Sequence, residues 1–430
     1  MTAGASRFVR DRLTVTLYTP FITWGWFLYC FSPAVPLIAD EQGISRGLAG
    51  LHGTTMAAGT IATGLFSSRV AERFGRKTQA LAGGVVLVVG ILMLVSGTTL
   101  AATLLACFVT SVGGNLTISA AQPALVVHQH AAGAAAVTEA NAMGAAIGLL
   151  APLALGACVG LGWGWRPAVA FVVVLAVAAA LALVPIRGEV ALDRGERRLV
   201  GPVAAGAVGT VIDLSDDDAP AEAVAGPAAG PAPATTEGFG RTFWMFWVAM
   251  LCGVAIEFST TFWASDLLIA RTDAPASVAT ASVSALVGGM AVSRFIVGPL
   301  SVRKAPEKLL LVGFTAAGLG WLVFWLATSP VVAVAGLVLA GLGYGTHYPL
   351  TVALALRASG GRPDRAQARA SLGTGGAVAV APFLLGALAD SFGAHQAFVL
   401  VPVLIVIGGT AVLFGMRSVR RDGRLARAAL

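Results

Sequence analysis

Residues 151–156 read APLALG, and 230 positions later residues 381–386 read APFLLG. The same ungapped offset aligns three further pairs of residues: Gly90 with Gly320, Gly113 with Gly343, and Arg73 with Arg303. One shift that matches four separate sites indicates an internal duplication. We therefore expect two structural repeats, each built from about half of the chain.

The composition indicates where these repeats fold. Of the 430 residues, 57% are hydrophobic and only 11% are charged, and the mean hydropathy is +0.83. Soluble domains carry about 25% charged residues, so this chain is expected in a lipid bilayer. A helix needs about 20 apolar residues to cross the hydrocarbon core. Twelve segments meet this requirement: residues 16–39, 47–68, 79–97, 100–125, 134–161, 166–187, 242–268, 277–301, 308–327, 330–356, 366–389 and 395–416.

A segment of different composition separates the sixth and seventh spans. Residues 188–240 are rich in Ala, Pro, Gly and acidic residues, and have too few large apolar side chains to form a core. We predict a disordered cytosolic linker here, between an N-terminal bundle (residues 1–187) and a C-terminal bundle with a basic tail (residues 241–430). The expected fold is an all-α membrane protein of two six-helix bundles, related by a pseudo-two-fold axis along the membrane normal.

The basic residues predict the orientation. All but four of the 28 Lys and Arg residues fall on one side of this arrangement, in the terminal segments and alternate connections. The exceptions are Arg46, Arg166, Arg271 and Arg294. Basic residues concentrate on the cytoplasmic side, so both termini are predicted to be cytosolic in the inner (cytoplasmic) membrane. The net charge of +7 follows from this topology and does not indicate nucleic-acid binding. The four cysteines lie in separate spans and are interpreted as packing residues.

Residues 64–81, GLFSSRVAERFGRKTQAL, connect the second and third spans. This segment resembles the signature loop of the major facilitator superfamily, Gly-x-Leu-Ala-Asp-Arg-x-Gly-Arg-Arg. The corresponding positions are Ser68, Val70, Ala71, Glu72, Arg73, Gly75, Arg76 and Lys77. Four of them depart from the pattern: Ser replaces the first Gly, Val replaces Leu, Glu replaces Asp, and Lys replaces the last Arg. The resemblance implies the twelve-helix fold of that superfamily and transport by alternating access. It also implies that this loop is a cytosolic latch between the two halves.

Two weaker patterns bear on the direction of transport. Drug/proton antiporters of the superfamily usually carry an Arg in the fourth helix, but residues 106–117, ACFVTSVGGNLT, contain none. The fifth span has Gly144, Gly148 and Gly156, which is similar to a Gly-Pro-rich motif of the antiporters. Close helix packing by small residues also explains this pattern.

A lone carboxylate, Glu257, lies in the seventh span within GVAIEFSTTFWASDLL. It is 15 residues into the span, or roughly 22 Å along a helix. A charged carboxylate at that depth costs several kcal/mol unless it is protonated, paired or hydrated. We predict that Glu257 couples transport to protons. A structural pair with Arg294 or with a hydroxyl group is the alternative. Asp266 lies half a turn around the helix and is predicted at headgroup level.

A solute cavity between the halves would draw on polar and aromatic residues of both. Thr261 shares the helical face of Glu257, and Arg294 could balance an anionic solute. The candidates are Trp26, Tyr29, Asn115, Asn141, Thr261, Trp263, Arg294 and His347. Each of these residues could instead serve packing.

Several functions find no support. The chain has no nucleotide-binding loop or dinucleotide fingerprint, so no cofactor is expected. It has no Ser-His or His-acid cluster of an enzyme, and His128 with His130 lacks further metal ligands. We predict a monomeric secondary transporter that moves a small organic solute, by proton-coupled efflux. The alternatives are a proton symporter that imports a sugar or an organic anion, and a sensor or scaffold that transports nothing.

Overall fold

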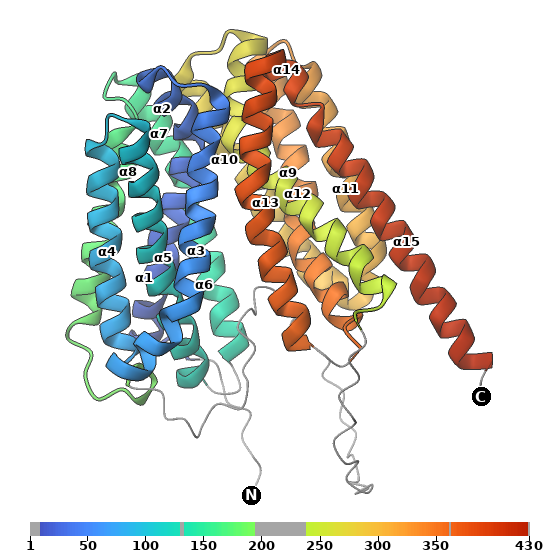
Figure 1. Ribbon diagram of the computed structural model, residues 1–430, viewed down its shortest axis with the longest axis horizontal. Helices are drawn as coiled ribbons and strands as arrows, with labels where there is room; N and C mark the ends of the chain where they lie inside the picture. Colours follow the sequence, from blue (N-terminus) through green and yellow to red (C-terminus); the bar gives the residue numbers. More distant parts are fainter. Residues whose placement is uncertain (1–8, 130–132, 194–237, 361–362, 429–430) are drawn as a thin grey trace, which may run out of the picture.

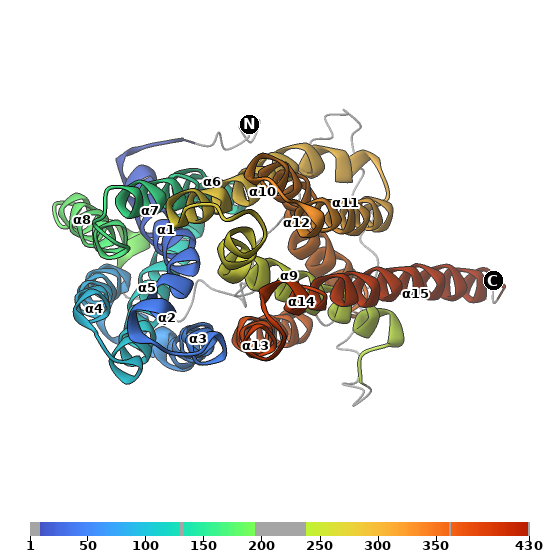
Figure 2. The same cartoon turned by 90° about the horizontal axis from the view of Figure 1, so that it is seen from above.

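The computed structural model describes residues 9–129, 133–193, 238–360 and 363–428 (Figure 1). Within these ranges the regular secondary structure is helical throughout. Two helical bundles stand side by side, one from each half of the chain (Figure 2). We call the end that carries α2 and α14 the upper end, as drawn in Figure 1, and the end where α1 begins and α15 finishes the lower end.

The helices follow the predicted spans with three interruptions. The N-terminal half contains α1 (Arg12–Phe31), the 3-10 turn η1 (Ser32–Ala34), α2 (Val35–Gln42), α3 (Arg46–Phe74), α4 (Arg76–Ser96), α5 (Leu100–Gln129), α6 (Gly133–Gly148), α7 (Leu150–Gly160), α8 (Arg166–Leu183) and the 3-10 turn η3 (Val190–Leu192). The C-terminal half contains α9 (Arg241–Thr272), α10 (Ala276–Arg303), α11 (Pro306–Leu326), α12 (Pro330–Arg357), α13 (Pro363–Phe392), α14 (Ala394–Ala397) and α15 (Leu400–Ala428). Pro33 and Pro36 interrupt the first span because proline lacks the backbone N–H that a continuous helix needs.

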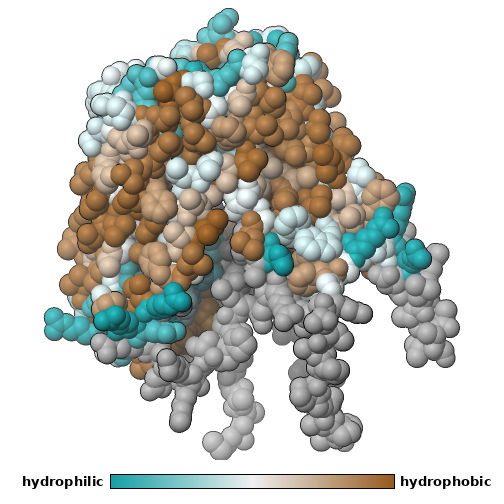
Figure 3. Space-filling view, viewed as in Figure 1, coloured by the Kyte–Doolittle hydropathy of each residue, from teal (hydrophilic) through white to brown (hydrophobic). Residues whose placement is uncertain are grey.

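Eleven helical segments in the described ranges are long and apolar enough to cross a membrane. The remaining predicted span, α3, has 29 residues, or about 43 Å of helix, but a more polar composition. Its neighbours explain the difference, because α3 packs against α5 of its own half and α13 of the other half. A helix that packs against protein on two sides needs less apolar surface than one surrounded by lipid. Figure 3 shows the broad hydrophobic band on the outside of the molecule. The predicted twelve-helix membrane fold is confirmed.

The duplication is confirmed at the level of individual contacts. A Cβ atom on Gly90 of α4 would collide with the backbone of Thr110 in α5. A Cβ atom on Gly320 of α11 would collide with the backbone of Ala340 in α12. Both residues of the second pair lie 230 positions after those of the first. The glycines therefore recur because the same close helix crossing is built twice.

The two halves meet along two seams. In the first seam, between α3 and α13, the Thr54 hydroxyl donates to the carbonyl of Ala379 at 2.5 Å. In the second seam, between α7 and α10, the Ser284 hydroxyl donates to the carbonyl of Leu149 at 2.9 Å. Donor and acceptor are both related by the offset of 230. Further down α3, a Cβ atom on Gly64 would have no neighbour within 4 Å. The halves thus touch in the upper part of the molecule.

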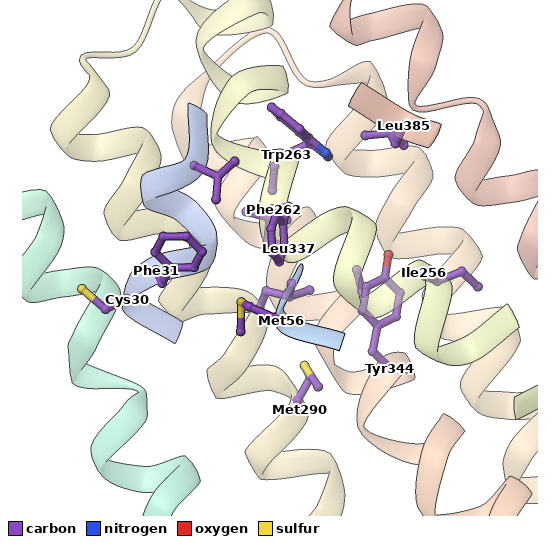
Figure 4. Close-up of a cluster of buried hydrophobic side chains, with 14 of the residues drawn as sticks. Cys30, Phe31, Met56, Ile256, Phe262, Trp263, Met290, Leu337, Tyr344 and Leu385 are labelled. Atoms are coloured by element: carbon purple, nitrogen blue, oxygen red, sulfur yellow. The ribbon is translucent and has the colours of Figure 1, made fainter. Parts of the chain in front are cut away.

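One large apolar cluster continues across both halves. Phe31 and Met56 from the first half join Phe262 and Met290 from the second in this cluster (Figure 4). Three of the four cysteines are buried and Cys158 is half-buried, in agreement with a packing role; all four are free thiols. The mutual burial of apolar side chains holds the upper parts of the bundles together in this conformation.

Candidate transport site

Glu257 lies near the middle of α9, 16 residues or about 24 Å from the start of the helix. Its side chain is half-buried, and no salt bridge in the described part of the chain includes it. Arg294 of the neighbouring α10 is within electrostatic range of the carboxylate. Glu257 and Arg294, the predicted pair, are thus close enough for a long-range electrostatic interaction but do not form a direct ion pair.

Arg294 also connects the two halves of the molecule. Arg294 is exposed as a residue, and its side chain interacts with that of Tyr29 in α1. Tyr29 is in turn within electrostatic range of Glu257. Three residues selected from the sequence, on α1, α9 and α10, therefore form one cluster at mid-depth between the halves. A cluster of a carboxylate, a guanidinium and a phenol can bind a polar solute or exchange a proton.

Two tyrosines of α12 complete the surroundings of Glu257 and were not predicted. Tyr344 and Tyr348 are both within electrostatic range of its carboxylate. The Tyr344 hydroxyl lies 3.1 Å from that of Thr260 on α9. The two tyrosines are four residues apart and so lie on one helical face, a spacing that could have identified them in the sequence.

His347 and Thr261 have other surroundings. The His347 side chain has no exposed surface and stacks on Phe314 of α11, with 4.0 Å between ring centroids. It fills the space left by Gly253 on α9. The hydroxyl of Thr261 donates to the backbone carbonyl of Glu257 at 2.7 Å. In this conformation both side chains pack in the interior of the C-terminal half.

Both candidate tryptophans are buried in helix contacts. The indole N–H of Trp26 donates to the carbonyl of Ala168 in α8 at 3.0 Å. That of Trp263 donates to the carbonyl of Pro382 in α13 at 2.8 Å. Their exposed fractions are 7% and 1%. Neither ring reaches the cluster around Glu257 through these contacts.

The asparagines differ from each other. The Asn115 amide on α5 donates to the hydroxyl of Thr60 on α3 at 3.0 Å and to the carbonyl of Ser111 at 2.8 Å. Thr60 is exposed, so this is an accessible polar patch on the N-terminal half. The Asn141 amide donates to the carbonyl of Val137 in its own helix at 2.9 Å.

A polar clasp at the upper end was missed by the sequence analysis. The carboxylate of Asp390, at the end of α13, accepts from the backbone N–H groups of Arg46 and Gly47 at 2.6 Å each. The Arg46 guanidinium donates to Asp266 of α9 at 3.1 and 3.2 Å and pairs with Asp40 at 2.6 Å. Asp266, predicted at headgroup level, is therefore also part of a contact between the halves. We call these residues the upper clasp.

The comparisons with known proteins agree with this architecture. The family model described as Major Facilitator Superfamily matches residues 21–307 and 267–429. The chain is a member of the major facilitator superfamily. A search of curated protein sequences found no significant match. As a superfamily member, the chain is a transporter protein with two halves that can move relative to each other.

Two solved structures illustrate the shared fold. One is a bacterial homolog of the human lysosomal transporter Spinster, in an inward-facing and unoccupied conformation. It is 14% identical, with a TM-score of 0.68 over 96% of this chain and 97% of that chain. The other is the nucleoside transporter NupG, 12% identical, with a TM-score of 0.68 over 94% of this chain and 98% of that chain. At these identities the likeness concerns the fold alone.

The superfamily's signature loop lies at the lower end, between α3 and α4. Gly75 has φ 86°, a value that favours glycine, and makes the tight turn. Arg76 donates to the carbonyl of Ala191 in η3 at 3.0 Å, and Lys77 to that of Val184 at 2.8 Å. Glu72 is exposed and, among the described residues, in no salt bridge.

The contacts that this loop makes with described residues therefore lie within the N-terminal half. The guanidinium of Arg73 lies 5.3 Å from the ring centroid of Phe74. The side chain of Ser68 lies outside the described residues. So does most of the predicted linker, residues 194–237, whereas its first residues pack through Ala191 and Leu192. A latch between the halves stays a prediction for another conformation.

His128 of the HxH pair lies near the start of α1. His128 Nε2 is 2.6 Å from a carboxylate oxygen of Asp11, which also caps α1 by accepting from the N–H of Thr14 at 2.8 Å. His130 lies outside the described residues. The imidazole thus orients a helix cap in the superfamily's first span.

Proposed function

We propose that this protein exports a small organic solute across the cytoplasmic membrane in exchange for protons, with Glu257 as the coupling residue. Membership of a superfamily of transporters supports transport by alternating access. The observation that carries the coupling is the position of Glu257: half-buried, at mid-depth, outside any salt bridge in the described chain and near Arg294.

The chemistry of coupling follows from this position. A carboxylate in a low-dielectric site has a strong preference for protonation unless a cation compensates its charge. Arg294 is close enough to influence the carboxylate, and no ion pair among the described residues joins the two in this conformation. Rocking of the halves changes the hydration of Glu257 and its distance to Tyr29 on α1 of the other half. Proton uptake and release can therefore be tied to the conformational cycle.

We further propose that the lower end faces the cytosol. The loop between α3 and α4, the connections with Lys304 and Arg357, and both terminal segments bring most of the basic residues to this end. Positive charge is concentrated on the cytoplasmic side of membrane proteins. With the upper end closed by two seams, this conformation would then face inward, and the protein would function as a monomer in which both halves share the site.

A reconstituted system tests the coupling. Candidate solutes from three classes, cationic amphiphiles, sugars and carboxylates, are first screened by thermal shift on the purified protein, because a ligand stabilises the state it binds. The solute found is then followed in proteoliposomes with an imposed pH gradient. We expect Glu257→Gln to abolish uphill transport and to retain solute counterflow, because a neutral side chain permits exchange without proton transfer.

The control variant is Glu139→Gln. This carboxylate pairs with Arg10 at 2.7 Å near the lower end, away from the cluster, and its removal should leave uphill transport intact. Full gradient-driven transport in a well-folded Glu257→Gln protein would refute the coupling assignment. Loss of both uphill transport and counterflow would indicate a role in solute binding instead.

One observation favours a second candidate function. Arg294 is an exposed residue of the cluster, and its positive charge suits an anionic solute. A proton symporter that imports an organic anion would use the same residues in the opposite direction. Acidification inside the liposomes during solute entry would identify import. The absence of any solute flux for all three classes would favour a sensor or scaffold.

A further inference from the structure

A groove runs along the outside of the C-terminal half, away from the candidate transport site. Its volume is about 630 Å³. The floor is one face of α9 and the walls are α13 and α15. Val248 on the floor precedes Glu257 by nine residues, or two and a half turns, so the groove and the acid lie on opposite faces of α9.

The lining of the groove is apolar over most of its length. Residues that represent the floor and the walls are Trp247, Leu251, Leu372, Val380, Leu384 and Leu404. Leu372, Val380 and Leu384 have exposed fractions of 60%, 57% and 41%. A surface of this kind inside the hydrophobic band of a membrane protein contacts lipid chains.

The lower mouth of the groove has a different character. Arg369 is exposed there and is the one charged side chain among the described residues that line the groove. The indole N–H of Trp247 donates to the carbonyl of Arg369 at 2.9 Å. Trp244 packs edge-on against Trp247, with 5.3 Å between ring centroids. Tryptophan beside an arginine is typical of the headgroup level of a bilayer.

The groove is long enough to hold one lipid chain. From Arg369 to Leu384 α13 rises through 15 residues, or about 22 Å. One leaflet of the hydrocarbon core is about 15 Å thick, half of the core's roughly 30 Å. An acyl chain can therefore lie in the groove with its phosphate at Arg369. A headgroup without its own cation is favoured, because nothing then competes with the guanidinium for the phosphate.

We propose that this groove binds one anionic phospholipid, with an acyl chain along α9 and the phosphate at Arg369. The glycerol backbone then lies beside Trp244 and Trp247. Because the floor of the groove is the helix that carries Glu257, a bound lipid also restrains the position of α9. The assignment is independent of the direction of transport and of proton coupling.

Two substitutions separate the contributions of charge and shape. Arg369→Gln removes the charge at the mouth. Gly376→Phe places a ring in the groove, where a Cβ atom on Gly376 would have no neighbour within 4 Å and so fits the folded protein. The matched controls are Arg417→Gln, an arginine of α15 outside the groove, and Gly409→Phe, where the nearest atom to a Cβ is 4.0 Å away.

The full-length protein in neutral detergent is titrated with phosphatidylglycerol or phosphatidylcholine of identical chains. Thermal unfolding and native mass spectrometry report the binding. We expect tighter binding of phosphatidylglycerol, a loss of about fivefold in its affinity in Arg369→Gln, and loss of the bound lipid in Gly376→Phe. Both controls should bind as the unsubstituted protein does.

Equal affinity for the two lipids overturns the proposal, as does unchanged phosphatidylglycerol affinity in Arg369→Gln. A well-folded Gly376→Phe protein that retains the lipid places the lipid elsewhere and also overturns it. If Gly376→Phe does not fold, Arg369→Gln and its control still decide the outcome.

Discussion

The two seams between the halves share their packing but differ in charge. In the first seam, a Cβ atom on Gly386 of α13 would lie 2.5 Å from the carbonyl oxygen of Arg46, at the start of α3. In the second seam, a Cβ atom on Gly156 of α7 would collide with the carbonyl of Ser277, at the start of α10. Gly156 and Gly386 are related by the internal repeat. In each seam, a helix of one bundle thus lies close to the first turn of a helix of the other bundle.

The charge is present once. Asp390 accepts two backbone N–H groups from the first turn of α3, whereas the position 230 residues earlier is Gly160, which has no side chain. A carboxylate at a helix N-terminus satisfies free N–H groups and interacts favourably with the helix dipole. The comparison teaches that duplication supplied the packing of both seams. Among the described residues, the carboxylate that closes the upper end belongs to the first seam alone.

Distances across each seam can be measured with pairs of spin labels. Suitable exposed positions are Leu48 with Phe392 across the first seam, and Leu161 with Val278 across the second. A longer distance across a seam reports opening of the upper end. These two pairs serve all the following tests.

The largest effect is expected from a wedge in either seam. Gly386→Val and Gly156→Val each force a side chain against a backbone that cannot yield, which costs about 1–3 kcal/mol. Both variants should therefore shift the upper end toward the open state, by about five- to a hundredfold in the equilibrium. The unfolding temperature serves as the control for folding. If only one of the two substitutions opens the upper end, the two seams are not equivalent.

Asp390→Asn is expected to open the upper end to a smaller extent. No equivalent substitution exists in the second seam, where the corresponding residue is Gly160. The carboxylate is exposed, so loss of its charge should cost only about 1 kcal/mol, or about fivefold in the equilibrium. High salt should also shift the unsubstituted protein toward the open state, because salt screens the interaction between the Asp390 carboxylate and the start of α3. Ser391→Ala, whose hydroxyl donates to a carbonyl of its own helix, is the matched control. Distances that are insensitive to both the substitution and salt would assign no closing role to Asp390.

The contrast also explains what the sequence could and could not predict. The repeat was visible because Gly90 and Gly320, or Gly113 and Gly343, are required by the same backbone contact in each half. Glu257 was visible because an acid in an apolar span is costly. Both signals are local, so they survive in a single sequence.

The upper clasp depends on tertiary structure. Asp390 and Arg46 are 344 residues apart, and nothing in either segment indicates that a carboxylate would cap a helix of the other half. The same applies to Asp266, which looked like a headgroup-level residue, and to Tyr344, which lies near Glu257 only because α12 packs against α9. The partners of residues that interact across helices can be identified only once the packing of the helices is known.

Effects comparable to that of Asp390→Asn, or smaller, should come from the matched hydroxyl bonds. Thr54→Val and Ser284→Ala each remove one hydrogen bond, worth about 0.5–1.5 kcal/mol. If the halves rock as rigid bodies, both seams open in one step, and Thr54→Val should change the distance across the second seam as much as across the first. The double variant should then multiply the two shifts, because free energies of independent sites add. If each substitution changes only the distance across its own seam, the two seams open separately. Asp390 would then control the opening of the first seam only.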